Sequence, residues 1–112
     1  PSDYEYQSIQ NQRVIMNLEK HGGKSEKKRP VDHWLYFASE EGRIQFVDEV
    51  SKLGYTIAGI EKLEDKENPY QLHILRHDTT IWRDVNKHVW ELITLAQPLG
   101  GAYDGWGCPI EA

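Results

Sequence analysis

The sequence predicts an α+β fold, in which helices and short strands alternate along a single chain. β-Branched and aromatic residues gather in short runs, which is typical of strands. Apolar residues recur at spacings of three and four in two longer segments between those runs, which is typical of helices packed on a core. Because the chain has 112 residues, we expect one domain over residues 1–112.

The chain begins with an expected helix over residues 3–22, because this segment contains no proline and carries a weak apolar face. Gly22 and Gly23 predict its end. A polar loop with a local basic cluster, residues 24–30, follows and is expected to be solvated. Residues 31–37 read VDHWLYF, and this run predicts the first strand.

A second helix is expected after Ser39, whose side chain suits an N-cap. Glu40 and Glu41 would lie near the positive end of the helix dipole, and Gly54 predicts the end of the helix. Residues 55–60 (YTIAGI) predict the second strand.

A charged, turn-like segment at residues 61–68 leads to a third expected strand at residues 70–76. Asp78 or Thr79 can cap the next helix, which has the clearest apolar stripe in the chain. The apolar positions of that helix are Ile81, Val85, Val89, Leu92, Ala96 and Leu99.

The expected order is therefore a helix followed by β-α-β-β-α-β, which is the order of ferredoxin-like folds. We expect a ferredoxin-like core over residues 30–112, with a four-stranded antiparallel sheet whose first and third strands are central. Two helices would cover one face of this sheet. Water, the first helix or a partner would cover the other face.

Residues 100–107 (GGAYDGWG) predict the fourth strand and combine four glycines with two large aromatic side chains. This combination predicts a strand that bends or bulges to orient those side chains. Regular alternation would place Tyr103 on one face and both Asp104 and Trp106 on the other. We interpret the segment as a buried edge of the core, and alternatively as a surface patch with an aromatic anchor and a carboxylate.

Alternation along the first strand predicts that His33 faces the covering helices. Asp32, Trp34 and Tyr36 would then lie on the open face. We expect the buried His33 to join a polar network with Asp32 or Asp104.

Charge and residue types argue against several classes of function. The net charge of −5 disfavours broad contact with nucleic acid, which requires clustered Lys and Arg. Cys108 is the only cysteine, so neither an internal disulfide nor a cysteine-based zinc site is expected. His73 and His77 would stand roughly 13 Å apart on one strand, too far for a single metal ion. Gly100 and Gly101 precede a strand and not a helix, so they are not expected to form a phosphate-binding loop. We expect no cofactor, no metal and no catalytic site.

Two segments resemble the RraB family, the regulators (inhibitors) of ribonuclease E. The family shows a Leu-x-x-Leu-Ala helix end and a Tyr-Asp-Gly-Trp-Gly strand at the spacing that LITLA and YDGWG have in residues 92–107. Residues 31–35 (VDHWL) and 53–55 (LGY) also match its spacing. The resemblance covers about Ile9 to Ile110. It implies a ferredoxin-like domain of the bacterial cytoplasm that binds the large endoribonuclease of the RNA degradosome and lowers its activity.

We therefore expect a cytoplasmic, non-catalytic regulator that inhibits an endoribonuclease of the ribonuclease E type by direct protein contact, with a homo-oligomer also allowed. The polar start of the chain and the absence of a long apolar run predict neither a signal peptide nor a membrane span. The candidate partner-binding residues are Asp32, His33, Trp34, Tyr36, Tyr103, Asp104 and Trp106.

Two alternatives stay open at this point. The open face around Trp34, Tyr36 and His73 suits a small molecule or metabolite. An RNA-binding module would stack bases on Trp34 and Tyr36, and it predicts a basic stripe beside Trp34.

Overall fold

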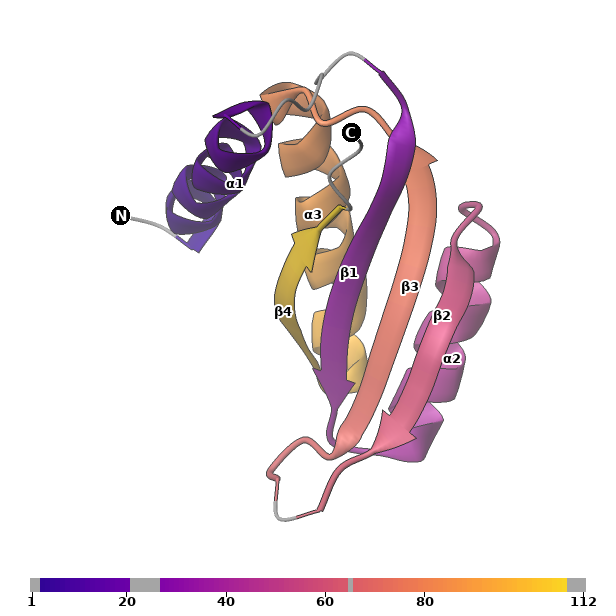
Figure 1. Cartoon of the computed structure of the whole chain (residues 1–112). Helices are drawn as coiled ribbons and strands as arrows, with labels where there is room; N and C mark the ends of the chain where they lie inside the picture. Colours follow the sequence, from indigo (N-terminus) through magenta and orange to yellow (C-terminus); the bar gives the residue numbers. More distant parts are fainter. Residues whose placement is uncertain (1–2, 21–26, 65, 109–112) are drawn as a thin grey trace.

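The computed structural model describes residues 3–20, 27–64 and 66–108, which form a four-stranded antiparallel sheet and three α-helices (Figure 1). The fold is α+β, as predicted, and the N-terminal helix is present. The predicted end of that helix at Gly22 lies outside the described residues. The elements are α1 (Asp3–Lys20), β1 (Arg29–Phe37), α2 (Glu40–Ser51), β2 (Thr56–Lys62), β3 (Tyr70–Asp78), α3 (Trp82–Ala96), the short 3₁₀-helix η1 (Gln97–Leu99) and β4 (Gly101–Gly107).

The strand order in the sheet is β2-β3-β1-β4, so that the first and third strands are central, as expected. β1 pairs with β3 along its whole length, from Arg29 opposite Asp78 to Phe37 opposite Tyr70. β2 and β4 form the two edges, and all three pairings are antiparallel.

Helices α2 and α3 lie behind the sheet in Figure 1 and cover one of its faces. Helix α1 stands beside β4 and packs against α3, so it does not lie over the other face. Water, the first helix or a partner was expected to cover that face, and the position of α1 excludes the first helix. This face, called the open face below, is the one turned toward the viewer.

The core lies between the sheet and the helices, in two clusters of buried side chains. Alternate residues of β1 are buried, because a strand directs successive side chains to opposite faces. The first cluster joins β1 and β3 to α2 and the end of α3, with Leu35, Phe46 and Leu92 at its centre. The second joins α1 to α3 and the end of β4, through Ile15 and Trp106.

The N-cap predicted from the sequence is present at α2 but not at α3. The Ser39 hydroxyl accepts a hydrogen bond from the Gly42 backbone N–H at 3.1 Å, so the predicted cap of α2 is confirmed. The predicted caps of α3 are wrong, because the helix begins after Ile81 without a side-chain cap. Asp78 instead ends β3, and the Thr79 hydroxyl donates to the Asp84 carboxylate at 2.7 Å.

Three strands are longer than their sequence patterns predicted, and one of them, β3, continues past the expected residue 76 to Asp78. β1 begins at Arg29, which is buried opposite Asp78, so the end of the expected polar loop belongs to the strand. β2 continues to Lys62, opposite Tyr70, within the segment expected as a turn. Pairing with the long strand β3 extends both β1 and β2 beyond their runs of apolar residues.

A β-bulge in β4 changes the expected directions of its side chains. In the register with β1, Tyr103 lies opposite Leu35 and Gly105 lies opposite Trp34, which leaves Asp104 as the extra residue. Trp106 lies opposite His33 and is buried. The predicted bulge is confirmed, but the predicted alternation is wrong, because Tyr103 and Trp106 both point toward the helices.

Two glycines of β4 provide a matched test of this packing. A Cβ on Gly101 would stand 2.5 Å from Cε2 of Phe37 and 2.9 Å from Cβ of Ala96, whereas a Cβ on Gly105 would meet nothing within 4 Å. We expect Gly101→Ala to lower the free energy of unfolding by about 1–3 kcal/mol, as overpacking does. Gly105→Ala is expected to change it by less than about 1 kcal/mol. Urea unfolding monitored by circular dichroism measures both values, and equal losses would contradict the packing explanation.

Candidate functional site

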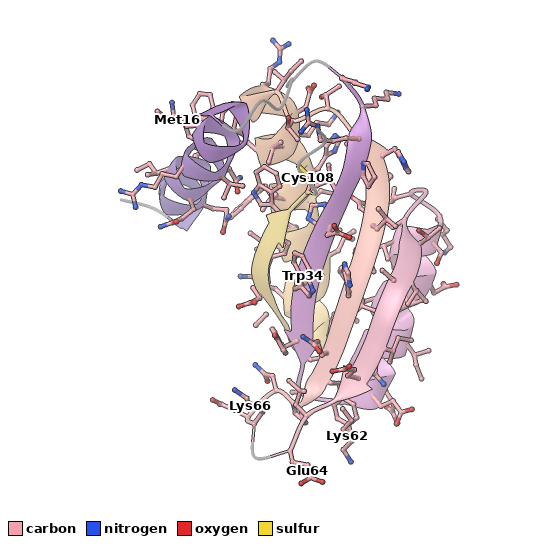
Figure 2. All side chains as sticks on the ribbon, viewed as in Figure 1. Met16, Trp34, Lys62, Glu64, Lys66 and Cys108 are labelled. Atoms are coloured by element: carbon pink, nitrogen blue, oxygen red, sulfur yellow. The ribbon has the colours of Figure 1, made fainter. Side chains whose placement is uncertain are left out.

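The open face carries a cluster of aromatic and polar side chains on the two central strands. Trp34, near the middle of β1 (Figure 2), stacks on the imidazole of His73 directly opposite on β3. The ring centroids are 4.6 Å apart and the planes differ by 20°. Nε2 of His73 lies 2.8 Å from Oδ1 of Asp32. This hydrogen bond fixes the imidazole ring, so Trp34 and His73 form one rigid surface across two strands.

Tyr36 and Gln71 extend this surface along β1 and β3. They lie opposite each other, and the Gln71 amide donates to the Tyr36 hydroxyl at 3.0 Å. On its other side Trp34 faces β4, where a Cβ on Gly107 would stand 3.9 Å from Cζ3 of the indole. We call Asp32, Trp34, Tyr36, Gln71 and His73 the open-face cluster.

A cavity of about 350 Å³ lies beside the open-face cluster, where β1 and β4 meet the loop between β2 and β3. Tyr36 and Asp104 line it from the strands, and Lys66 and Glu67 line it from the loop. Lys66 and the neighbouring hairpin residues project at the lower end of the sheet in Figure 2. The bulge residue Asp104 thus directs a carboxylate to the same region as Tyr36.

His33 lies on the covered side of β1, as predicted, but with a different partner from those expected. Its Nδ1 lies 2.8 Å from the Tyr103 hydroxyl, and its ring packs edge-on against Tyr55 with centroids 5.7 Å apart. The expected network with Asp32 or Asp104 is therefore wrong. Asp32 points to the other face, and the bulge brings Tyr103 under the sheet.

A second group of polar side chains, half-buried, continues from Tyr55. The Arg76 guanidinium lies 4.1 Å from the centre of the Tyr55 ring. It donates to the Asp78 carboxylate and to the Leu53 carbonyl, each at 2.8 Å, and lies 3.0 Å from Nδ1 of His88. This arrangement ties β3 to α3 and to the end of α2.

Burial and positive neighbours shift the proton affinities in this layer. Burial, assisted by the charge of Arg76, lowers the pKa of His33 to about 3, so the imidazole is neutral at physiological pH. Burial also raises the pKa of Tyr103 and of Tyr55, and lowers that of His88. The rings of His33, Tyr55 and Tyr103 are therefore neutral at physiological pH, with the Arg76 cation beside them.

Trp106 is held by a polar network that docks α1. Its indole N–H donates to Oδ1 of Asn11 at 2.8 Å, and the Asn11 amide donates to Oδ1 of Asn86 at 2.8 Å. Asn86 in turn donates to the Ser8 hydroxyl at 2.8 Å, which closes the network between α1 and α3. Since Asn11 and Trp106 are buried, these hydrogen bonds position the first helix as well as satisfying polar atoms.

The structure thus separates the seven residues singled out from the sequence. Asp32, Trp34 and Tyr36 lie together on the open face, and exposed Asp104 lies at the neighbouring edge. The remaining three, His33, Tyr103 and Trp106, belong to the covered side. Sequence reasoning missed Gln71 as a member of the cluster and Asn11 as the partner of Trp106. Gln71 could have been assigned to the open face, because it precedes the apolar Leu72 and successive side chains of a strand point to opposite faces. No pattern in the sequence around Asn11 indicated that it pairs with Trp106.

Two negative findings apply to the described part of the chain. No three His, Cys, Asp or Glu side chains come together there in a way that would hold a metal ion. Within the same residues, no helix is both long and apolar enough to cross a membrane.

Comparison with known families gives one match. A family model described as "Regulator of ribonuclease activity B" (RraB) matches residues 8–108, nearly the whole chain. A comparison with curated proteins found no match.

The depressed pKa of His33 predicts a stability that depends on pH. In the unfolded chain the imidazole protonates near its ordinary value of 6.5, whereas in the folded protein it resists protonation down to about pH 3. The stability that depends on neutral His33 is therefore complete above about pH 6.5 and is lost as the pH falls toward 3. We expect His33 to add up to about 1.4 kcal/mol per pH unit to the slope of the free energy of unfolding against pH.

The measurement is urea unfolding at pH values across that window, with His33→Gln as the comparison. The variant is expected to be less stable at neutral pH but to lose less stability on acidification. Parallel pH dependences for the two proteins would contradict the assignment.

Trp106 is expected to be a core residue whose removal also releases α1. Trp106→Ala should lower the free energy of unfolding by about 3–5 kcal/mol. Trp106→Phe should lower it by about 1–3 kcal/mol, because Phe retains an aromatic ring but loses the bond to Asn11 and part of the buried ring volume. Amide hydrogen exchange in α1 should accelerate in both variants. Trp34 supplies the control, since Trp34→Ala removes an indole from the open face and should leave exchange in α1 unchanged, whereas the indole N–H of Trp82 donates to the Ser8 carbonyl of α1 at 3.0 Å. A Trp106→Ala protein with native stability would overturn this interpretation.

Proposed function

Because the chain belongs to the RraB family of regulators of ribonuclease activity, we propose that it inhibits an endoribonuclease of the ribonuclease E type by binding it directly. The family match over residues 8–108 is the observation that carries this proposal. The role is binding and not catalysis, and its place is the bacterial cytoplasm, where such a nuclease works on RNA. The partner is a protein.

The open-face cluster is the proposed contact surface. An indole and an imidazole stacked on central strands are rigid before binding, so little side-chain entropy is lost when a partner covers them. Trp and Tyr are also the residues that most often dominate binding energy at protein interfaces. Asp32 and Asp104 give the surface its negative character, which suits a basic partner segment, in keeping with the net charge of −5.

The candidate residues on the covered side have a supporting role in this proposal. Tyr103 orients β4 from below through its contact with His33, and Trp106 fixes α1. Changes at His33, Tyr103 or Trp106 would therefore reduce binding through the fold. Changes at Asp32, Trp34, Tyr36 or Asp104 would reduce it at the surface.

A small-molecule site is the second candidate function, and the cavity between Tyr36 and Asp104 favours it. Its volume of about 350 Å³ is in the range of ligand sites. The RNA-binding alternative has less support, because the residues beside Trp34 are Asp32, His73 and glycines, and not the basic stripe that it predicts.

The proposal predicts that Trp34→Ala weakens binding to the endoribonuclease and relieves inhibition of RNA cleavage. Loss of a central aromatic anchor should cost about 2 kcal/mol, roughly a 30-fold increase in Kd. Asp32→Asn should weaken binding less and reduce its dependence on salt. Titration calorimetry and a cleavage assay with the nuclease of the source organism measure these effects, with thermal unfolding as the check on folding.

Ile44→Ala is the control, because Ile44 is an exposed apolar side chain on α2, on the helical side of the sheet and away from the open face. It should leave both binding and inhibition unchanged. Equal effects of Trp34→Ala and Ile44→Ala would reject the open face as the contact surface. Failure of the native chain to bind the nuclease at low salt would reject the proposed function itself.

A further inference from the structure

β4 is the last strand of the sheet, and within the described part of the chain it pairs with β1 alone. No other described strand pairs with its outer edge. In an edge strand, alternate backbone N–H and C=O groups point away from the sheet and are available to another extended chain. The glycines of β4 leave little side-chain bulk along it, since three of its seven residues are Gly101, Gly105 and Gly107.

Two adjoining cavities follow this edge and make a groove. One has a volume of about 410 Å³ and lies between β4 and α1, with Gln10 on its helical wall. The other has about 370 Å³ and lies between β4 and α3, with Trp90 and Ile93 on its wall. Both are lined by Gln7 and Tyr103, so they adjoin each other. We call the combined space the β4 groove; Figure 1 shows α1 standing beside this edge of the sheet.

The chemistry of the groove suits a peptide backbone. Amide side chains such as Gln7 and Gln10 can donate and accept hydrogen bonds, and Trp90 and Ile93 supply an apolar wall. Among the described residues that line the groove, Asp104 is the only charged one. An occupant therefore needs an extended backbone, small or apolar side chains toward α3, and a basic side chain beside Asp104.

We propose that the β4 groove binds an extended, basic segment of a partner protein, which adds to β4 as a fifth strand. Main-chain hydrogen bonds supply affinity in this mode of recognition, and side-chain pockets supply selectivity. The inference rests on the proposed function only for the identity of the partner, which is the regulated nuclease. A second copy of this chain fits less well, because α1 stands beside the outer edge of β4, where the sheet of another copy would have to continue.

The edge at β2 differs in these respects. Ile57 and Ile60 are exposed on it, and neither of the cavities that make up the β4 groove reaches it. Both edge strands contain a bulge, between Ile57 and Gly59 in β2 and at Asp104 in β4, so the bulges do not distinguish the two edges. The groove along β4 does, and it makes this edge the one suited to receive a chain.

A random library of displayed peptides of about twelve residues, selected on the intact chain, tests the groove without the nuclease. The selected peptides are expected to be basic and free of proline. Two synthetic versions of the best binder then carry N-methyl groups on alternate residues, one set in each register. Because alternate N–H groups of a strand point in opposite directions, one set should weaken binding at least tenfold and the other should not.

Hydrogen exchange and one filling variant locate the site. Peptide binding should slow amide exchange in residues 101–107 and leave β2 unchanged. Gln97→Trp places an indole at the exposed end of the groove and should weaken peptide binding at least tenfold. The matched control is Gln45→Trp at an exposed position of α2, which should bind as the native chain does. Asp104→Asn should weaken binding and reduce its dependence on salt.

The outcomes separate the two proposals. Equal binding of both N-methylated peptides, or unchanged exchange in β4, overturns strand addition even when the nuclease binds the open face. Selected peptides that protect β4 support the groove even when the nuclease fails to bind, which then rejects the proposed function alone. Concentration-dependent protection of β4 without peptide, together with a dimer in sedimentation, overturns the inference in favour of a second copy of this chain.

Discussion

The bulge at Asp104 is the constraint on which the rest of the structure depends. Tyr103 and Trp106 are three positions apart, so in a regular strand they would face opposite sides of the sheet. One extra residue in β4 turns both toward the helices. Each ring carries a polar atom that requires a partner once buried, and each finds one, Tyr103 at His33 and Trp106 at Asn11. The bulge therefore sets the contents of the core and the place where α1 docks.

The covered side of the sheet is consequently rich in neutral polar rings. His33, Tyr55 and Tyr103 lie between sheet and helices, where desolvation disfavours every charged form of these groups. Arg76 is tolerated beside them because it is offset by Asp78 and lies over the Tyr55 ring. Such a layer restricts the geometry of the core, since the contact between His33 and the Tyr103 hydroxyl requires one relative orientation of these two rings.

Most of the fold was predictable from local pattern, and most of the site was not. The α2 cap, the stripe of α3 and the alternation of β1 depend on neighbours in sequence, and the structure confirms them. The same patterns placed Asp32, Trp34 and Tyr36 on one face. The pairing of Trp106 with Asn11 spans 95 positions, and the partner of His33 depends on the site of the bulge. Glycine content indicated that β4 bulges, but the position of the extra residue follows only from the register with β1.

Because both β4 aromatics are used beneath the sheet, the open face takes its rings from the central strands alone. β4 is left with glycines and one carboxylate on its outer surface, which opens the strand edge to approach. Asp104 lines the cavity beside Tyr36 on one side and the β4 groove on the other. A partner that covers the open-face cluster and extends along β4 must therefore pass this carboxylate. The residue that breaks the regularity of the strand is thus the one that joins the two recognition surfaces.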